Sequence, residues 1–212
     1  MQKKYKVLLI ILASILLLTA IVFIGFRMYD GNDTTEIKHV DNILDYGYTL
    51  EERDSKLMKK VFSSLKSELK KDTVDYQKYA EYLSELYIID LFTIDNKINK
   101  YDIPCLEYIL DDSISNFSLN VEDTLYKYVE DNSNKNRKQD LPVVKNVILE
   151  NIEIGDYTFN SEKYESFKVS LKWDYLKDFG YDTRGIVTLI KKDNKLFVVN
   201  YTADGGQDEE SN

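Results

Sequence analysis

The sequence predicts an α+β domain carried behind an N-terminal transmembrane helix. Three observations lead to this prediction. An uncharged apolar run fills residues 7–26, helical hydrophobic spacing dominates residues 49–96, and alternating hydrophobic spacing dominates residues 143–201. Helices that come first in a chain, followed by strands joined by short turns, indicate helices packed on one face of an antiparallel sheet. We therefore divide the 212 residues into an anchor, a tether and one globular domain.

The apolar segment 7–26 has the length of a membrane-spanning helix, because about 20 residues at 1.5 Å each cover the apolar thickness of a bilayer. Lysines gather in the stub 1–6, whereas the flank after Arg27 is acidic. The positive-inside rule therefore places the N-terminus in the cytoplasm and the rest of the chain outside. The alternative is a cleaved signal peptide, with Ser14 and Ala20 as small residues for an earlier cut, but the run is longer than such segments usually are.

Composition excludes several classes of function. The net charge of −9 and the isoelectric point of about 4.8 argue against nucleic-acid binding, which requires a basic surface. One histidine, His39, and one cysteine, Cys105, provide too few ligands for a zinc site, so we predict no metal and no cofactor. A single cysteine also excludes a disulfide within the chain. The Lys-, Asn-, Ile- and Tyr-rich usage is typical of Gram-positive bacteria of low GC content.

A polar tether is predicted for residues 27–47 and the globular domain for residues 48–202. The domain begins with Thr49-Leu50-Glu51-Glu52, which has the form of a capping box. In that motif a Thr side chain accepts a hydrogen bond from a backbone N–H, and a Glu side chain three positions later reaches back. Hydrophobic residues then recur at helical spacing. We therefore predict the first helix of the domain from Thr49 to about Lys71.

A second helix is predicted between Asp75, its N-cap, and about Asn96. Its C-terminal half is apolar on nearly all sides, so we expect this helix to be the most buried of the domain. Asp90 interrupts the apolar region. A buried carboxylate costs several kcal/mol unless it is paired or hydrogen-bonded. Asp90 is therefore either a satisfied core acid, which is the interpretation that we favour, or a catalytic base.

Two shorter helices are expected next, at Cys105–Leu110 and at Glu122–Asp131. The hydrophobic period then changes to that of strands. We predict strands over residues 143–154, 167–175, 183–191 and 196–201. A short turn at Lys192–Lys195 joins the last two into a hairpin. The tail, residues 203–212, is acidic and is predicted to be disordered.

This plan resembles the nuclear transport factor two-like domain, a cone in which a strongly bent antiparallel sheet wraps N-terminal helices. The resemblance covers about residues 48–202 and rests on the segments YGYTLEERDSKLMKKVF, YAEYLSELYIIDLFTIDNK and GIVTLIKKDNKLFVVNYT. Behind one N-terminal anchor, the plan is similar to the inner-membrane assembly component of type IV secretion and conjugation systems. It is also similar to uncharacterised membrane proteins of Gram-positive bacteria. Such cones include enzymes and binding modules, so fold alone does not decide function.

The sequence favours a non-enzymatic binding or assembly module outside the membrane, in a secretion, conjugation or envelope complex. The expected partners are the membrane and either other envelope proteins or a second copy of the chain; an abundance of tyrosine suits such interfaces. The alternative is an enzyme or a small-ligand sensor that uses the cavity of the cone. Asp90 is then the candidate acid or base, with Tyr87 or Trp173 lining the cavity, although no second polar group that could polarise a substrate is evident.

Overall fold

The computed structural model describes Thr19 and residues 37–203. The predicted anchor apart from Thr19, residues 27–36 of the tether and the tail beyond Ala203 lie outside the described residues, so they stay predictions. Within the described part of the chain, no helix is both long enough and apolar enough to span a bilayer. The described residues 37–203 belong to one compact unit, which we call the domain.

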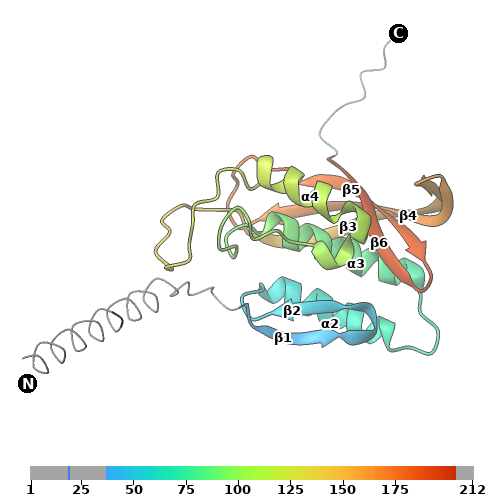
Figure 1. Cartoon of the computed structure of the whole chain (residues 1–212). Coiled ribbons are helices and arrows are strands. Elements are labelled where there is room, and N and C mark those ends of the chain that lie inside the picture. Colours follow the sequence, from blue (N-terminus) through green and yellow to red (C-terminus); the bar gives the residue numbers. More distant parts are fainter. Residues whose placement is uncertain (1–18, 20–36, 204–212) are drawn as a thin grey trace, which may run out of the picture. The chain divides into compact units, whose positions relative to one another are not determined.

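The domain has an α+β fold, as predicted, in which helices pack with a curved antiparallel sheet (Figure 1). The helices are α2 (Lys56–Leu69), α3 (Tyr76–Phe92) and α4 (Asp111–Asp123), with short 3-10 helices η1 (Leu44–Tyr46) and η2 (Leu106–Tyr108). The sheet contains, in spatial order, β3 (Val144–Phe159), β4 (Glu162–Tyr175), β5 (Arg184–Lys192) and β6 (Lys195–Ala203). A separate hairpin consists of β1 (His39–Ile43) and β2 (Tyr48–Glu51).

Helix α3 is the central helix of the domain and the most buried one, as expected from its apolar sequence. It contacts α2 on one side and strands β3, β4 and β6 on the other. The predicted N-cap is confirmed, since the Asp75 side chain accepts hydrogen bonds from the amides of Gln77 and Lys78. The helix ends at Phe92, before the predicted Asn96, because Thr93 leaves the helical conformation and its hydroxyl accepts from the Val144 amide of β3.

The predicted capping box at Thr49 is wrong. Thr49 lies in β2, and both its amide and its hydroxyl donate to the Glu107 carboxylate. The helix instead begins at Lys56, where the Ser55 hydroxyl accepts a hydrogen bond from the Met58 amide. The four residues of β2 alternate buried and half-buried, which is the period of a strand. Because β2 is short and directly precedes a strongly periodic helix, the sequence analysis assigned its residues to that helix.

The domain also begins earlier than predicted. Residues 39–46, which the sequence analysis placed in the tether, form β1 and η1, and β1 pairs antiparallel with β2. Gly47 completes the connection in a left-handed conformation, with φ of 69°. Only Ile43 of β1 is fully buried, so this strand carries almost no hydrophobic signal. His39 lies at its exposed start.

The two shorter helices were predicted in the wrong places. The Cys105–Leu110 segment contains only η2, and α4 occupies Asp111–Asp123, mostly between the two predicted helices. Beyond Asp123 the predicted Glu122–Asp131 helix gives way to turns. The acidic pair at the start of α4, Asp111 and Asp112, lies in its first turn, where acidic side chains stabilise a helix. Because α4 buries only Val121 completely, its hydrophobic period is weak.

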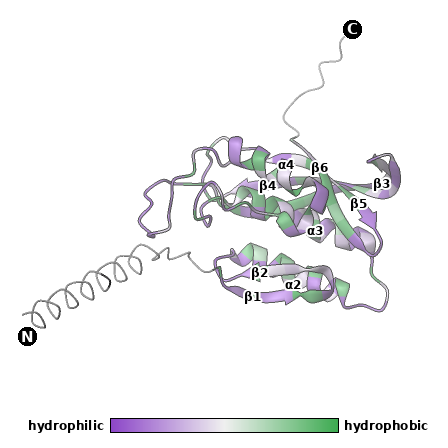
Figure 2. Ribbon diagram, in the orientation of Figure 1, coloured by the Kyte–Doolittle hydropathy of each residue, from purple (hydrophilic) through white to green (hydrophobic). Residues whose placement is uncertain are grey.

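The sheet follows the predicted strands closely. In β4, Phe167, Val169, Leu171 and Trp173 are fully buried and alternate with more exposed polar residues. The pairing of β3 with β4 shifts register between Val144 and Asn146 and between Leu149 and Asn151. Strand β3 continues beyond the predicted residue 154, so that the β3–β4 hairpin extends past β5. The predicted β5–β6 turn is confirmed by the pairing of Lys192 with Lys195. Figure 2 shows hydrophobic residues along α3 and β6, whereas the loop between α4 and β3 is hydrophilic.

Candidate functional site

Helix α3 contributes side chains to two cavities of different chemistry. Asp90 lines a charged cavity of about 260 Å³, together with residues of β2 and of the loop that contains η2. Tyr87 and Leu91 line a larger pocket of about 500 Å³, which also has walls from α4 and β6. We call the first the charged cavity and the second the aromatic pocket. In the charged cavity, carboxylates form ion pairs with Arg53 and Lys97, whereas no described residue that lines the aromatic pocket is basic.

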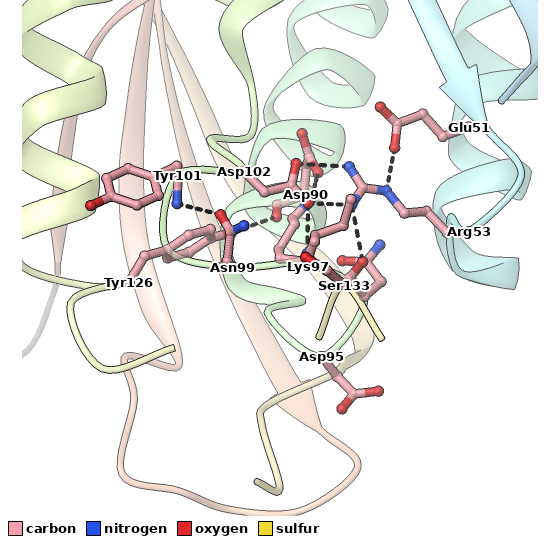
Figure 3. Close-up of polar contacts among 12 residues, drawn as sticks. Glu51, Arg53, Asp90, Asp95, Lys97, Asn99, Tyr101, Asp102, Tyr126 and Ser133 are labelled. Carbon is pink, nitrogen blue, oxygen red and sulfur yellow. Dashed lines mark hydrogen bonds and ion pairs between the residues drawn. The ribbon is translucent and has the colours of Figure 1, made fainter. Parts of the chain in front are cut away.

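Both carboxylate oxygens of Asp90 are engaged, and Figure 3 shows Asp90 next to Lys97. One oxygen forms an ion pair with the Lys97 ammonium, and the other accepts a hydrogen bond of 2.8 Å from the Cys105 amide. Lys97 is only 3% exposed, and burial lowers its pKa while the neighbouring Asp90 carboxylate raises it more, so that the pKa of Lys97 stays above its usual value. These contacts are the kind of pairing that a carboxylate in a core requires.

A second ion-pair network joins the turn between β2 and α2 to the loop after α3. The Arg53 guanidinium binds the Asp102 carboxylate with two nitrogens and also contacts Glu51, as Figure 3 shows. The same side chain donates to the Asn96 carbonyl at 3.2 Å. Burial raises the pKa of Asp102, but the bonds from Arg53 and from the Ile98 amide outweigh it and leave that pKa below its usual value. The charged cavity is therefore built by structural ion pairs.

Cys105 shows what the Asp90 carboxylate does for the fold. Its backbone is left-handed, with φ of 64°, a conformation that residues other than glycine rarely adopt. The bond from the Cys105 amide to Asp90 fixes this turn, and its thiol donates to the Tyr87 carbonyl at 3.4 Å. Asp90 therefore positions the loop that leads into η2.

Glu107 connects this loop to the β1–β2 hairpin. Its carboxylate accepts hydrogen bonds from the Thr49 amide at 3.0 Å and from the Thr49 hydroxyl at 2.8 Å. Burial nevertheless raises the pKa of Glu107 from 4.5 to about 7. Burial likewise raises the pKa of Asp54, which lines the same cavity, to about 6.

We expect Glu107→Gln to flatten the pH dependence of stability. Because the folded-state pKa of Glu107 exceeds the unfolded one, its contribution is complete below pH 4.5 and is lost as the pH rises through 7. The shift implies a loss of roughly 3 kcal/mol, which exposure to solvent reduces to about 1–2 kcal/mol. Urea unfolding between pH 4.5 and pH 8 measures it. The exposed Glu52→Gln is the control, and an equal pH dependence in the Glu107→Gln and wild-type chains would contradict the assignment.

The aromatic pocket is bounded by α3, α4, β6 and the loop before β5. Its lining residues are Tyr87, Leu91, Phe92, Ile109, Ser113, Asn116, Phe117, Asn120, Val121, Thr124, Leu125, Asp182, Val198, Val199, Asn200 and Tyr201. Aromatic and aliphatic side chains dominate this set, and asparagines from α4 and β6 add polar groups. A preformed apolar pocket with a few convergent polar groups is the usual form of a ligand-binding site.

The structure separates the three residues that sequence analysis placed in one cavity. Tyr87 lines the aromatic pocket, Asp90 lines the charged cavity, and Trp173 is fully buried behind the pocket wall. The Trp173 ring lies 5.2 Å from that of Phe92 and 6.5 Å from that of Tyr201. Trp173 therefore supports the pocket without lining it.

Asp182 is a pocket residue that sequence analysis missed. The Trp173 indole donates to the Tyr175 hydroxyl at 2.9 Å, and this hydroxyl donates to the Asp182 carbonyl at 2.7 Å. The Asp182 carboxylate accepts a hydrogen bond of 3.2 Å from the Tyr201 hydroxyl. Asp182 lies in an exposed loop without a hydrophobic period, so nothing in the sequence singled it out. Asn116 and Asn120 have the four-residue spacing of one helical face, a signal that could be used only once α4 was placed.

Gly185→Ala is expected to disturb the pocket wall. A Cβ atom at Gly185 would lie 2.8 Å from the Tyr201 ring and 2.9 Å from the Thr202 carbonyl oxygen, so the ring has to move. We expect a loss of about 1–3 kcal/mol in unfolding free energy and a weaker Tyr201–Asp182 bond. Denaturant unfolding and NMR of the Tyr201 ring test this. Gly155→Ala, whose Cβ would meet only the Ser166 hydroxyl oxygen at 4.0 Å, is the matched control. Unchanged Tyr201 signals in Gly185→Ala would contradict the prediction.

Comparison with protein-family models, curated proteins and solved structures finds no match to this chain.

Proposed function

We propose that this chain is a non-enzymatic, membrane-anchored binding module of an envelope complex, with its domain outside the cytoplasm and the aromatic pocket as its binding site. The observation that carries the proposal is the pocket itself, about 500 Å³ of mainly apolar space with walls from α3, α4 and β6. The membrane part rests on the apolar segment 7–26 and the lysines before it.

The state of the acidic residues favours binding over catalysis. A general base must lie within hydrogen-bond reach of the proton that it removes. Asp90 lines a different cavity from the aromatic pocket, and both its oxygens are engaged by Lys97 and Cys105. In the pocket, the Asp182 carboxylate accepts a hydrogen bond from Tyr201, a group whose pKa burial and the nearby Asp182 raise. This arrangement supports the recognition of a ligand.

The tyrosines support a pocket more than a broad tyrosine-rich surface. Four of them, Tyr48, Tyr79, Tyr108 and Tyr126, are almost completely buried. The hydroxyls of Tyr48 and Tyr79 form a hydrogen bond in the core, and the Tyr48 hydroxyl also donates to the Leu196 carbonyl of β6. We therefore place the proposed binding site at Tyr87 and Tyr201, which line the pocket, and not at the exposed tyrosines Tyr101 and Tyr128, which do not. The role in an envelope complex is proposed from the resemblance in plan that the sequence suggests to secretion-system assembly components.

Topology is tested with a membrane-impermeant maleimide on intact cells that express the full chain. Lys163→Cys places a thiol on an exposed position of β4, whereas the wild-type chain has only the buried Cys105. We expect labelling of the variant alone, with the label in the membrane fraction. Labelling only after lysis would contradict an external domain, and labelled protein in the medium would indicate a cleaved signal peptide.

Binding at the pocket is tested by site-specific photo-crosslinking in the same cells. A benzophenone amino acid replaces Asn120 or Asn200, which are exposed residues of the pocket rim, or Lys163 as a control. We expect one defined adduct from both rim positions and none from Lys163. The adduct should persist with Asp90→Asn in a folded chain. An equal yield from all three positions, or loss of the adduct in an Asp90→Asn chain that circular dichroism shows to be folded, would contradict the proposal.

A further inference from the structure

We infer that the aromatic pocket binds an organic cation, an alkylammonium group carried by a small molecule or by a lysine side chain of a partner. The inference rests on the proposed function and deepens it, because it names the chemistry that the pocket accepts. It depends on the aromatic rings of the pocket, on one fixed carboxylate, on the charges of the lining residues and on one accessible tyrosine hydroxyl.

The rings of the pocket are tilted against one another. The Tyr87 ring centroid lies 6.3 Å from that of Phe117 and 6.2 Å from that of Tyr201, with interplanar angles of 48° and 47°. Phe92 lies 5.8 Å from Tyr201 at 63°. Tyr87 and Phe92 are only 3% and 2% exposed, so the accessible aromatic surface of the pocket comes from the half-buried rings of Phe117 and Tyr201. The negative face of an aromatic ring attracts a cation, most strongly where water is excluded.

Asp182 supplies the negative charge of the pocket and is held in place from two sides. Its backbone carbonyl accepts from the Tyr175 hydroxyl, and one carboxylate oxygen accepts from the Tyr201 hydroxyl. Tyr201 is also one of the lining rings, so the carboxylate is attached directly to the aromatic wall. A carboxylate next to aromatic rings suits a ligand with a positive charge on an apolar body.

The other described residues that line the pocket do not neutralise the negative charge of Asp182. None of the described residues that line the pocket is a lysine, an arginine or a histidine. The charged cavity contrasts with it, since Arg53 and Lys97 already neutralise carboxylates there. An anionic ligand in the aromatic pocket would meet Asp182 without a cation to offset the repulsion. Charge complementarity therefore favours a cation in the aromatic pocket.

Tyr87 provides a further polar group for the ligand. Its side chain is 3% exposed and lines the pocket. Among the described residues its hydroxyl has no hydrogen-bond partner, and this oxygen is not one of the enclosed unpaired atoms of the domain, so it is accessible to a ligand. An ammonium N–H, or a hydroxyl carried by the ligand, can satisfy this group.

The inference is tested by calorimetry on the full chain in maltoside micelles, whose headgroup carries no charge. The probes are choline and its neutral isostere 3,3-dimethyl-1-butanol, and fluorescence of Trp173, the only tryptophan, reports on the pocket wall. We expect choline to bind at least threefold more tightly than the isostere. Asp182→Asn should abolish this difference. Asp193→Asn, which removes the same charge from the β5–β6 turn, should leave it unchanged.

Two further probes identify the source of the cation. A short peptide with one lysine is compared with the same peptide carrying norleucine. Tighter binding of choline would indicate a small molecule, and tighter binding of the lysine peptide would indicate a partner side chain; either result supports the inference. It is overturned if both cations bind no better than their neutral counterparts, or if Asp193→Asn has the effect of Asp182→Asn.

Failure of this inference can be told from failure of the proposed function. If the cations do not bind but Asn120 and Asn200 still give a defined adduct in cells, the pocket binds a partner of other chemistry. If the cations bind but no adduct forms, the pocket is a cation site and the assembly role is wrong.

Discussion

Replacing Lys97 with methionine is expected to destabilise the domain by about 3–4 kcal/mol. Lys97 is 3% exposed and forms an ion pair with Asp90, which is itself only 16% exposed. Methionine preserves most of the volume but leaves the carboxylate without its cation. Breaking one side of a buried pair typically costs about 3–5 kcal/mol, because the remaining charge is uncompensated. The loss would be a large part of the stability of an ordinary domain. Urea unfolding of the full chain measures it.

A double variant tests whether the unpaired Asp90 carboxylate causes this loss of unfolding free energy. Lys97→Met together with Asp90→Asn removes both charges, and an Asn oxygen can still accept from the Cys105 amide. We expect the double variant to recover at least half of the lost free energy. Lys177→Met, which breaks the exposed pair with Asp140, should cost less than about 1 kcal/mol. If the double variant is no more stable than Lys97→Met alone, lost packing and not the unpaired charge explains the effect.

Trp173→Ala is expected to cost about 3–5 kcal/mol and to open the wall behind the aromatic pocket. The side chain is completely buried and packs against Phe92 and Tyr201, two of the lining rings. Truncation of so large a side chain loses its transfer free energy and leaves a cavity. The indole N–H that orients the Tyr175 hydroxyl is lost as well. Circular dichroism at increasing denaturant measures the loss without using tryptophan fluorescence.

Trp173→Phe separates packing from hydrogen bonding. It keeps an aromatic ring against Phe92 and Tyr201 but removes the donor to Tyr175. We expect a cost of about 1–2 kcal/mol, the scale of one buried hydrogen bond and a small void. NMR signals of the loop that contains Asp182 should shift in both variants. Equal costs for Trp173→Phe and Trp173→Ala would show that the ring itself contributes little.

The long, strongly patterned elements were predictable from the sequence. The alternation from Phe167 to Trp173 identified β4 because the sheet buries one face completely. The polar residue Asp75 before an apolar helix identified the start of α3. In both cases the hydrophobic period and the local capping or turn chemistry indicate the same structure.

Elements with little buried surface escaped prediction. Strand β1 buries only Ile43 completely, and α4 buries only Val121, so neither has a clear period. The aromatic pocket was missed for a related reason, since its polar residues Asn116 and Asp182 come from α4 and from a loop. Asp90 was recognised as an acid that requires partners. Its partners, Lys97 and the Cys105 amide, depend on the path of a loop that no sequence pattern fixed.

The β1–β2 hairpin determines how the domain responds to a mechanical pull on the chain before Ile37. His39 at the start of β1 pairs with Glu51 at the end of β2, so the pulled strand and the link to α2 leave the hairpin at the same end. Force applied there loads the Glu52–Lys38 bond first and then the rungs of the ladder one after another, in an unzipping geometry. Detachment of β1 would lengthen the pulled chain by about 3.3–3.6 Å per residue. Strand β1 would thus detach before the force reaches the core around Tyr48 in β2.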